Sequence, residues 1–318
     1  MNRGDLIAPR VAFGKALAEA GNIYKDLVVF DADVCASTQT QYFKDAFPER
    51  FYQSGIAEAN MVGMAAGMAA SGATPFVSTF AVFLAKRAAD QIRVSVAYPK
   101  ANVKLNGAYG GLPTGKAGAT HSSVEDIAVM RAMPHMQILV PADPVETRAA
   151  VMLALETPGP VYLRTVRCPV PVILPENHRM IFGQGLELHA GQDIALVSTG
   201  MMTPKTLAAA EILAKEGIKA RVIHLGTLKP LDNQIIIKAA RECGHIVTVE
   251  NHSIIGGLGG AVAEVLTEHY PCRQTRIGFP DIFMESGDDE AIFSLLGMNT
   301  ENIAQKVRTI LKTKKEIK

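Results

Sequence analysis

The sequence predicts an α/β protein with two consecutive doubly wound domains, in which helices cover both faces of a parallel sheet. Short apolar runs rich in β-branched residues alternate with helical patterns along the chain, which is typical of such sheets. A proline-containing segment near the middle separates a first alternation from a second one. We therefore expect a first domain over residues 1–168, a linker over 169–190 and a smaller domain over 191–318.

The strands of the first domain are expected to be buried and short. They are Leu27–Phe30, Pro75–Val77, Val103–Leu105, Gln137–Val140 and Val161–Leu163. The segment from Cys168 to Gly183 follows them and contains three prolines. Because proline lacks an N–H donor and restricts the residue before it, we interpret this segment as an extended linker.

The second domain is expected to repeat the alternation on a smaller scale. Its predicted strands are Ile194–Ser198, Ala220–Ile223 and Ile246–Glu250, and its predicted helices are Pro204–Glu216 and Gly260–Glu268. The glycine-rich segment Gly256–Gly260 lacks the G-x-G-x-x-G order and the downstream acid of a dinucleotide site. A closely packed helix start or a subunit contact is the better interpretation of these glycines.

Composition argues against several classes of function. The 318 residues carry a net charge of +1, so no basic excess is present to attract nucleic acid. The 4 cysteines form no C-x-x-C pair, which favours reduced thiols over disulfides or a metal site. No signal-peptide core opens the sequence, and no apolar run is long enough to span a bilayer. We therefore expect a cytoplasmic protein that binds neither nucleic acid nor membranes, with no metal site of its own.

One carboxylate occupies an unusual position near the start of the chain. Glu58 opens the small, apolar helical stretch Ile56–Gly67. Phe80 and Phe83 come next, and a glycine-rich loop ends at His121. Taken singly, the helix macrodipole explains an acid in a first turn, and the two aromatics could be core residues. Together, their order and spacing predict a flat ring held by aromatic side chains with an acid at its edge.

These residues belong to a set of motifs that resembles the transketolase family, in particular its pyrimidine-binding and C-terminal domains. The resemblance covers nearly the whole chain. Its motifs are Ala8–Arg10, Asp31–Ser37, Ile56–Glu58, Ser78–Phe83, Gly118–His121, Val140–Asp143, Tyr162–Arg167 and Thr248–His252. The chain looks like the C-terminal subunit of a transketolase split into two polypeptides. The resemblance implies that a two-carbon ketol unit passes from a ketose to an aldose, with thiamine diphosphate as cofactor.

The resemblance also implies which residues hold the cofactor. Glu58 would be the carboxyl group that hydrogen-bonds to pyrimidine N1′ and makes the cofactor's own amino group basic. Phe80 and Phe83 would pack on the pyrimidine ring, where aromatic contacts add to plain area burial. Asp33, in the turn that ends at Ser37, would belong to the same cofactor site.

The substrate end of the site is assigned in the same way. His121 would assist proton transfer at the sugar carbonyl, although it could instead cap a helix entered by Ser122–Glu125. The residues that match the family's contacts to an anionic sugar terminus are Arg10, Ser37 and Arg167, with Arg164 as a second choice. Alternatively, Arg10 could pair with Asp5 or Asp31, and either later arginine could be an ordinary charge at a strand end.

Three positions depart from the family pattern. Tyr109 stands where the family has a histidine, Lys116 where it has an acid, and Ala117 where it has an aspartate. An exchange of aspartate for alanine removes a hydrogen-bond acceptor, which costs about 1–3 kcal/mol if a substrate hydroxyl is left unpaired. Tyr109 and Lys116 offer a hydroxyl and a cation instead. The cofactor chemistry is thus expected to be retained, with a substrate such as a sulfonated or branched sugar.

The chain lacks the Gly-Asp-Gly motif with which thiamine diphosphate enzymes hold the diphosphate and its divalent cation. We therefore expect Mg²⁺ or Ca²⁺ to be held mainly by a partner, the N-terminal diphosphate-binding subunit. Because each site would need both chains, we expect an assembly with two copies of each subunit.

Two other functions fit parts of the pattern. The beta subunit of a 2-oxoacid dehydrogenase complex shares the plan of a glutamate, a helix and aromatics, but Arg10 and Arg167 favour an anionic sugar. A non-catalytic regulatory or binding subunit would explain the departures at Tyr109 and Ala117. The intact Glu58 and its aromatic neighbours argue against that reading.

Overall fold

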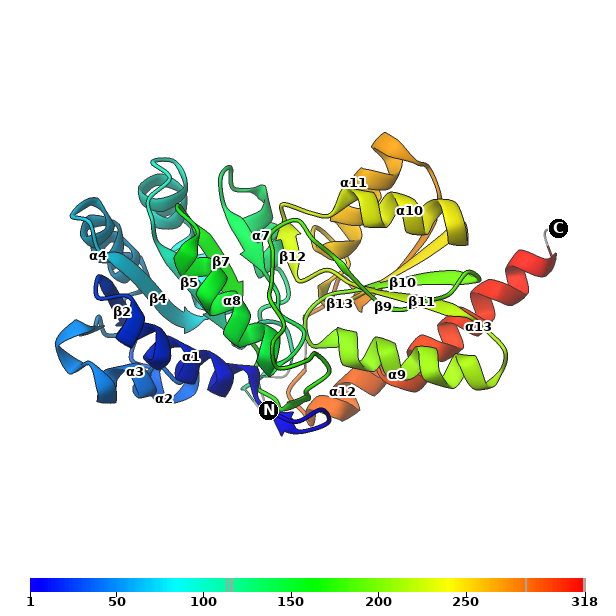
Figure 1. Ribbon diagram of the computed structural model, residues 1–318, viewed down its shortest axis with the longest axis horizontal. Helices are drawn as coiled ribbons and strands as arrows, with labels where there is room; N and C mark the ends of the chain where they lie inside the picture. The colour runs from blue at the N-terminus through cyan, green and yellow to red at the C-terminus, as the bar shows by residue number, and fades with distance from the viewer. Residues whose placement is uncertain (113, 115–116, 284, 317–318) are drawn as a thin grey trace.

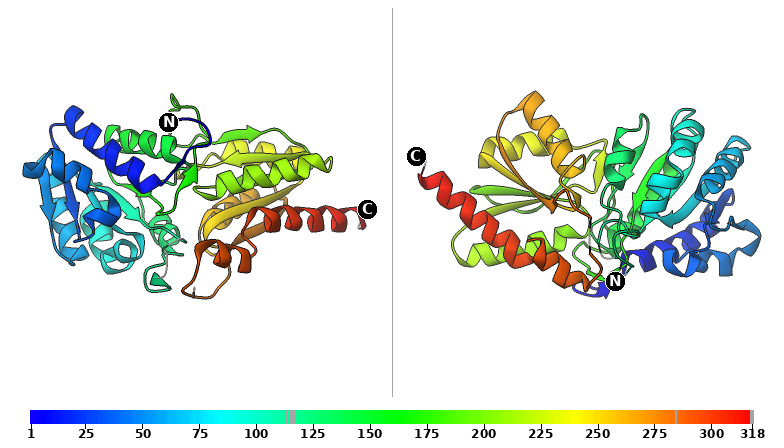
Figure 2. Two further views of the ribbon diagram at one scale, coloured as in Figure 1. Left: turned by 90° about the horizontal axis from the view of Figure 1, so that it is seen from below. Right: turned by 180° about the vertical axis from the view of Figure 1, so that it is seen from behind.

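The computed structural model describes residues 1–112, 114, 117–283 and 285–316. It confirms the predicted fold class, because each half of the chain forms a mostly parallel sheet with helices on both faces (Figure 1). The two halves lie side by side, and the N-terminus lies near their junction (Figure 2).

The first half builds a seven-stranded sheet in the order β12-β6-β7-β5-β4-β2-β3. Its strands are β2 (Leu27–Asp31), β3 (Phe51–Gln53), β4 (Thr74–Phe80), β5 (Lys104–Ala108), β6 (Gln137–Leu139), β7 (Val161–Arg164) and β12 (Thr227–Lys229). Six of these strands run parallel, and β12 pairs antiparallel with β6. Since β12 comes from the second half of the chain, the second half completes the first sheet.

Alternate residues of the strands face two different helical layers, as the period of a strand requires. In β2, Leu27 and Val29 pack against α1 (Pro9–Ile23) and α8 (Pro144–Glu156). Val28 and Phe30 belong to the opposite core, whose helices are α4 (Glu58–Ala70), α5 (Ala81–Arg87) and α7 (Asp126–Ala132). The first half of the chain also contains shorter elements. They are α2 (Cys35–Thr38), α3 (Gln41–Ala46), α6 (Ala89–Gln91), a 3-10 turn (Pro48–Arg50) and a π-helical turn (Ile92–Ala97).

The motif that ends at Asp143 has a structural role. Asp143 Oδ1 accepts the Glu146 backbone N–H at 2.8 Å and so caps the start of α8. Its Oδ2 accepts the backbone N–H groups of Ile173 and Leu174, both at 2.8 Å. One carboxylate therefore starts a helix and fixes the path of the segment predicted to be a linker. Within that segment, β8 (Val170–Pro171) pairs antiparallel with β1 (Leu6–Ile7).

The second half builds a five-stranded sheet in the order β14-β13-β10-β11-β9. Its strands are β9 (Leu186–His189), β10 (Ile194–Ser198), β11 (Ala220–His224), β13 (His245–Ser253) and β14 (Arg273–Phe279), and only β9 is antiparallel to its neighbour. In Figure 1, α10 (Asn233–Cys243) and α11 (Leu258–His269) lie on one side of this sheet. The other side carries α9 (Met202–Lys215) and α13 (Thr300–Glu316), with α12 (Asp289–Leu295) nearby.

The glycine-rich segment before α11 is a closely packed helix start, one of the two interpretations that the sequence allows. A side chain at Gly257 would collide with the buried Glu250, and one at Gly259 would collide with Arg276. The carboxylate oxygens of Glu250 accept the backbone N–H groups of Leu258 and Gly259 at 2.7 and 2.8 Å. These glycines let a carboxylate reach the helix N-terminus, where the macrodipole favours it.

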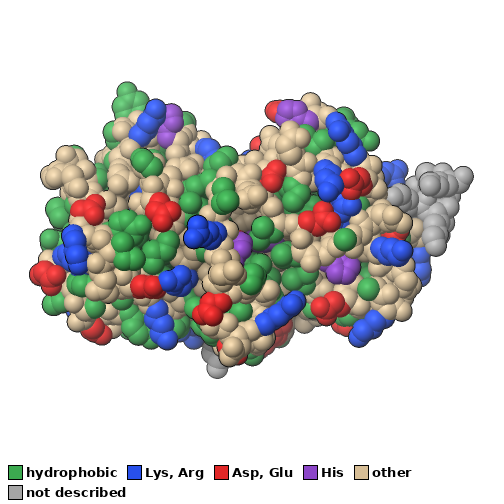
Figure 3. Space-filling model, in the orientation of Figure 1, with side chains coloured by type: hydrophobic (Ala, Val, Ile, Leu, Met, Phe, Trp, Pro, Cys, Tyr) green, Lys and Arg blue, Asp and Glu red, His purple; other side chains and the backbone are tan. Residues whose placement is uncertain are grey.

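The molecular surface agrees with the near-zero net charge. Figure 3 shows acidic and basic side chains interspersed over one face, with a hollow between the two halves. Among the helices of the described ranges, none combines the length and apolar character that crossing a membrane requires.

Candidate functional site

Most of the predicted site residues gather near the carboxyl ends of neighbouring strands in the first sheet. Phe80 is the last residue of β4, Tyr109 directly follows β5, and Arg167 comes three residues after β7. The carboxyl ends of parallel strands meet at one edge of a sheet, and α/β proteins bind their ligands at that edge. The fold therefore brings together residues that are far apart in the sequence.

Four rings form an aromatic cluster at this edge. Phe80 stacks on Tyr109 with ring centroids 4.4 Å apart, and on Phe83 at 5.7 Å. His121 meets Phe83 edge-on at 5.3 Å and Phe80 edge-on at 6.0 Å. Such offset and edge-to-face arrangements are the favoured geometries of aromatic pairs. The cluster offers flat apolar surfaces next to a histidine that can carry a proton.

Glu58 is joined to this cluster through an arginine that sequence reasoning missed. Glu58 opens α4 and is only 3% exposed, and its Oε1 accepts a hydrogen bond from Arg87 Nη1 at 3.0 Å. The Arg87 guanidinium carbon lies 3.9 Å from the centre of the Phe83 ring. No donor reaches Glu58 Oε2 from the residues that the structure describes. The spacing of four between Phe83 and Arg87 on one helix was the available signal, since it places both on one face.

Two arginines approach the other side of the cluster. Arg10 Nη1 donates to the Tyr109 hydroxyl and to the Ser37 carbonyl, both at 3.0 Å. The guanidinium carbons of Arg10 and Arg167 lie 5.6 and 5.9 Å from the centre of the Tyr109 ring. Neither arginine pairs with a carboxylate within the described ranges. Asp31, the partner considered for Arg10, is buried and accepts the Thr38 and Thr40 hydroxyls instead.

Arg164, the second choice for the contact to an anionic sugar terminus, does not lie at this site. Its side chain is 2% exposed, and its Nε and Nη2 donate to the two oxygens of Asp126 at 2.8 and 3.0 Å. The Tyr162 hydroxyl donates to the same carboxylate at 2.6 Å. Burial opposes ionisation of Asp126, but the charge and hydrogen bonds of Arg164 outweigh it and lower the pKa of that carboxyl. Arg164 is committed to a buried ion pair.

The remaining predicted site residues lie around the aromatic cluster or are not among the residues that the structure describes. Asp33 sits in an exposed turn with a φ of 62°, and its backbone N–H donates to Gln53 Oε1 at 2.7 Å. His121 lies in a turn with its Nδ1 2.8 Å from the Thr120 hydroxyl, whereas α7 begins only at Asp126. Because α7 does not begin at Ser122, His121 does not cap a helix there. Lys116 lies outside the described residues.

No metal centre is formed by this chain over the ranges described. Among those residues, no group of three or more histidine, cysteine, aspartate or glutamate side chains could hold a metal ion. Among the described residues, the cations next to the aromatic cluster are guanidinium groups, and the buried carboxylate that is joined to the cluster is Glu58. This arrangement suits an uncharged ring and an anionic terminus better than a cation.

The chain matches known proteins by family, by sequence and by structure. Residues 5–171 match the transketolase pyrimidine-binding domain, and residues 183–303 match the transketolase C-terminal domain. A "putative transketolase C-terminal section" of Methanocaldococcus jannaschii is 42% identical over 306 residues, which cover 95% of this chain and 96% of that protein. A "6-deoxy-6-sulfo-D-fructose transketolase subunit" of Clostridium sp. (strain MSTE9) is 38% identical, covering 91% of this chain and 89% of that protein.

A solved structure agrees with these matches. It is described as a "split gene transketolase, inactive beta4 tetramer", and it superposes with a TM-score of 0.87 at 45% identity. The superposition covers 96% of this chain and 98% of the other. The matches span both halves of the chain, and they include separate subunits of about the same length. This chain therefore belongs to the transketolase family, of which it carries the pyrimidine-binding and C-terminal domains.

Proposed function

We propose that this chain is the C-terminal subunit of a two-chain transketolase, which transfers a two-carbon ketol unit from a ketose to an aldose. The observation that carries the proposal is a continuous path of contacts across the site. It runs from the buried Glu58 through Arg87 and the aromatic cluster to Arg10 and Arg167. An acid, flat aromatic surfaces and two cations thus occur in the order that a cofactor ring and an anionic sugar would need.

The residues present fit the pyrimidine of thiamine diphosphate, the cofactor that the family implies. Glu58 has one oxygen without a partner among the described residues, and a buried carboxyl group can hydrogen-bond to pyrimidine N1′ there. Phe80 and Phe83 supply ring faces for packing. When bound, the cofactor supplies the carbon nucleophile that attacks the ketose carbonyl. The diphosphate and its divalent cation, Mg²⁺ or Ca²⁺, are held mainly by the partner, since this chain has no Gly-Asp-Gly motif.

His121 and the arginines act on the sugar. The ring of His121 belongs to the aromatic cluster, and its Nε2, which has no partner among the described residues, can pass a proton to or from a sugar oxygen. Arg10 and Arg167 hold the anionic terminus, because neither is neutralised by a carboxylate of the described residues. Ser37 orients Arg10 through its backbone carbonyl. Asp33, in the turn before Ser37, is proposed to face the cofactor in the complete site.

The assembly contains the N-terminal, diphosphate-binding subunit and a second copy of this chain, as two copies of each subunit. Each site then needs residues from both kinds of chain, and a two-fold axis relates the two sites. The near-zero net charge and the absence of a long apolar run in the sequence support a cytoplasmic enzyme.

The loop around Tyr109 is proposed to select the anion. Tyr109, Lys116 and Ala117 replace a histidine and two acids of the family pattern, and a relative is named for a sulfonated fructose. Restoring the family residues with Tyr109→His, Lys116→Glu and Ala117→Asp should move activity toward ordinary sugar phosphates. The test is a donor panel of xylulose 5-phosphate, fructose 6-phosphate and a sulfonated ketose, assayed with wild-type and triple-variant assemblies. A wild type that already prefers the phosphates, with a triple variant that changes nothing, would contradict this role of the loop.

Arg167→Ala is expected to weaken transition-state binding by about 1.5–3 kcal/mol, the range for a hydrogen bond to a charged group. The loss should appear in kcat/KM, because the contact to the anionic terminus is made by substrate and transition state alike. The matched control is Arg179→Ala, which removes an arginine from the linker segment. An Arg167→Ala variant that keeps the control's kcat/KM would show that Arg167 does not hold the substrate.

A further inference from the structure

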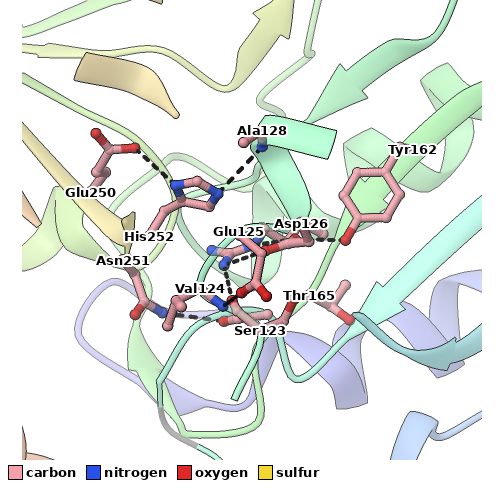
Figure 4. A network of polar contacts seen from close by, with 12 residues as sticks. Ser123, Val124, Glu125, Asp126, Ala128, Tyr162, Thr165, Glu250, Asn251 and His252 are labelled. Atoms are coloured by element: carbon pink, nitrogen blue, oxygen red, sulfur yellow. Dashed lines mark hydrogen bonds and ion pairs between the residues drawn. The ribbon is translucent and has the colours of Figure 1, made fainter. Parts of the chain in front are cut away.

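Two consecutive residues of β13 in the second domain contact the backbone of the first domain beside the site. Figure 4 shows Asn251 and His252 reaching from β13 toward the loop and helix start of the first domain. Both side chains are almost fully buried, at 2% and 0% exposed. Neither touches the aromatic cluster itself, and both contact the backbone that carries it.

Asn251 hydrogen-bonds to the backbone of the loop that follows Tyr109. Its Oδ1 accepts the Leu112 backbone N–H at 2.9 Å. Its Nδ2 donates to the Gly110 carbonyl at 3.2 Å and also to the Leu112 carbonyl. The side-chain amide therefore uses both its acceptor and its donors on one short stretch of backbone. This stretch begins one residue after the tyrosine that stacks on Phe80.

The backbone held by Asn251 is in an unusual conformation. Tyr109 has a φ of 60°, a left-handed value that a tyrosine rarely adopts, and Gly111 has a φ of 74°. A side chain at Gly111 would meet Asn251 atoms at 2.4–2.5 Å. The glycine thus lets the loop lie directly against Asn251, and the amide in turn holds the loop in its bent path.

His252 hydrogen-bonds to the backbone at the start of α7, on the C-terminal side of His121. Its Nδ1–H donates to the Ser253 carbonyl at 2.8 Å, which leaves Nε2 to accept the Ala128 backbone N–H at 3.3 Å in the first turn of α7. Burial lowers the pKa of His252 to about 4, so the ring stays neutral and keeps this acceptor at neutral pH. Ser253 adds a backbone bond to the Val124 carbonyl at 2.7 Å.

The two ends of the held segment are joined to each other. The Gly111 N–H donates to the Ser123 carbonyl at 2.7 Å, and Arg164 Nη2 donates to the same carbonyl at 3.0 Å. The loop between these points carries His121. Asn251 therefore holds the backbone directly after Tyr109, and His252 and Ser253 hold the backbone that follows His121.

We infer that Asn251 and His252 of the second domain are positioning residues for the cofactor and substrate site of the first domain. The inference rests on the proposed function for its consequence in catalysis, but the geometry it describes belongs to this chain alone. On this account, the second domain holds the Tyr109 and His121 rings in their orientation toward the site. Removing the side-chain contacts of Asn251 or His252 should change the orientation of these two rings. The remaining contacts between the domains should keep the chain folded.

The first test measures the ring geometry directly in the full-length chain. In wild type, the Tyr109 and Phe80 rings should give nuclear Overhauser contacts, since their centroids are 4.4 Å apart. Asn251→Ala should lose these contacts. The matched control is Lys229→Met, because Lys229 Nζ also crosses between the halves and donates to the Arg131 and Met133 carbonyls, at 2.8 and 2.6 Å. The control should keep the Tyr109–Phe80 contacts. If Asn251→Ala does not fold, Asn251→Ser serves in the same comparison.

The second test uses the variants assembled with the diphosphate-binding subunit. Asn251→Ala should raise KM for the donor sugar about 10- to 100-fold, as expected when a substrate-contacting group is misplaced. Lys229→Met should keep the wild-type KM, because a purely structural loss lowers only the amount of active enzyme. Ring contacts and KM that persist in Asn251→Ala, or a rise in KM that is equal in Lys229→Met, would overturn the inference. If wild type itself shows no ketol transfer, the proposed function fails, and the ring contacts alone still decide the positioning role.

Discussion

Glu58→Gln should lower the rate of ketol transfer by about 10²–10⁴-fold, the contribution of a positioned acid–base group. Glutamine keeps the shape of the side chain and an oxygen that can accept the hydrogen bond from Arg87, so α4 should remain folded. The amide cannot share a proton with a ring nitrogen as a carboxyl group can. The variant should therefore bind the cofactor but fail to raise the basicity of its amino group.

The measurement is hydrogen–deuterium exchange at C2 of the thiazolium ring in the assembled enzyme. Wild type should exchange this proton rapidly, and Glu58→Gln should exchange it close to the rate of free cofactor. Glu19→Gln is the control, because Glu19 is exposed and pairs with Arg148 on the outer helices. Exchange in Glu58→Gln that matches the Glu19→Gln control would remove Glu58 from cofactor activation.

Asp126→Ala should destabilise the folded chain by about 3–5 kcal/mol, because it leaves the buried charge of Arg164 without its partner. The Tyr162 hydroxyl loses its acceptor at the same time. Equilibrium unfolding in urea, followed by circular dichroism, measures the difference in unfolding free energy from wild type.

Two controls separate the buried charge from a general loss of contacts. Glu19→Ala breaks the exposed pair with Arg148 and should cost only about 0.2–1 kcal/mol. The double variant Asp126→Leu with Arg164→Met removes both charges and should cost less than Asp126→Ala alone. Equal effects of Asp126→Ala and Glu19→Ala would show that the ion pair contributes little in its buried setting.

The buried parallel strands were the part of the fold most accessible from the sequence. Ile194–Ser198 was predicted with the bounds of β10, since a continuous apolar run marks a strand covered on both faces. Six strands were not predicted, namely β1, β3, β8, β9, β12 and β14, and the last two show why. β14 lies at a sheet edge, where only Ile277 and Phe279 are buried, so its pattern is largely polar. β12 joins the sheet of the other half, and no local pattern reports such a long-range pairing.

The site was predictable where motif order carries the information. Phe80, Phe83 and His121 occur together in the structure. Phe80 ends β4, Phe83 lies in the helix α5 that follows β4 directly, and His121 lies between β5 and α7. Arg164 and Arg167 could not be separated from the sequence, because three residues apart they look alike. The structure places Arg164 as the last residue of the buried β7 and Arg167 beyond the strand, beside Tyr109.

The contact of Arg87 with Glu58 and the contacts of Asn251 could not be read from the sequence. Arg87 reaches Glu58 across 29 positions of the chain, and Asn251 reaches Leu112 across 139. Such contacts depend on how helices and domains pack, and neither composition nor periodicity encodes them. They are also the contacts that join the motifs into one site.

The central claim is that this chain supplies one half of a thiamine diphosphate site, and calorimetry of cofactor binding tests it most directly. Thiamine diphosphate with Mg²⁺ is titrated into this chain alone, into the diphosphate-binding subunit alone and into their mixture. The account predicts tight binding by the mixture, no binding by this chain at micromolar concentrations, and a loss of tight binding when Phe83→Ala replaces wild type in the mixture. Tight Mg²⁺-dependent binding by this chain alone, or a mixture that binds no better than the diphosphate-binding subunit, would contradict it.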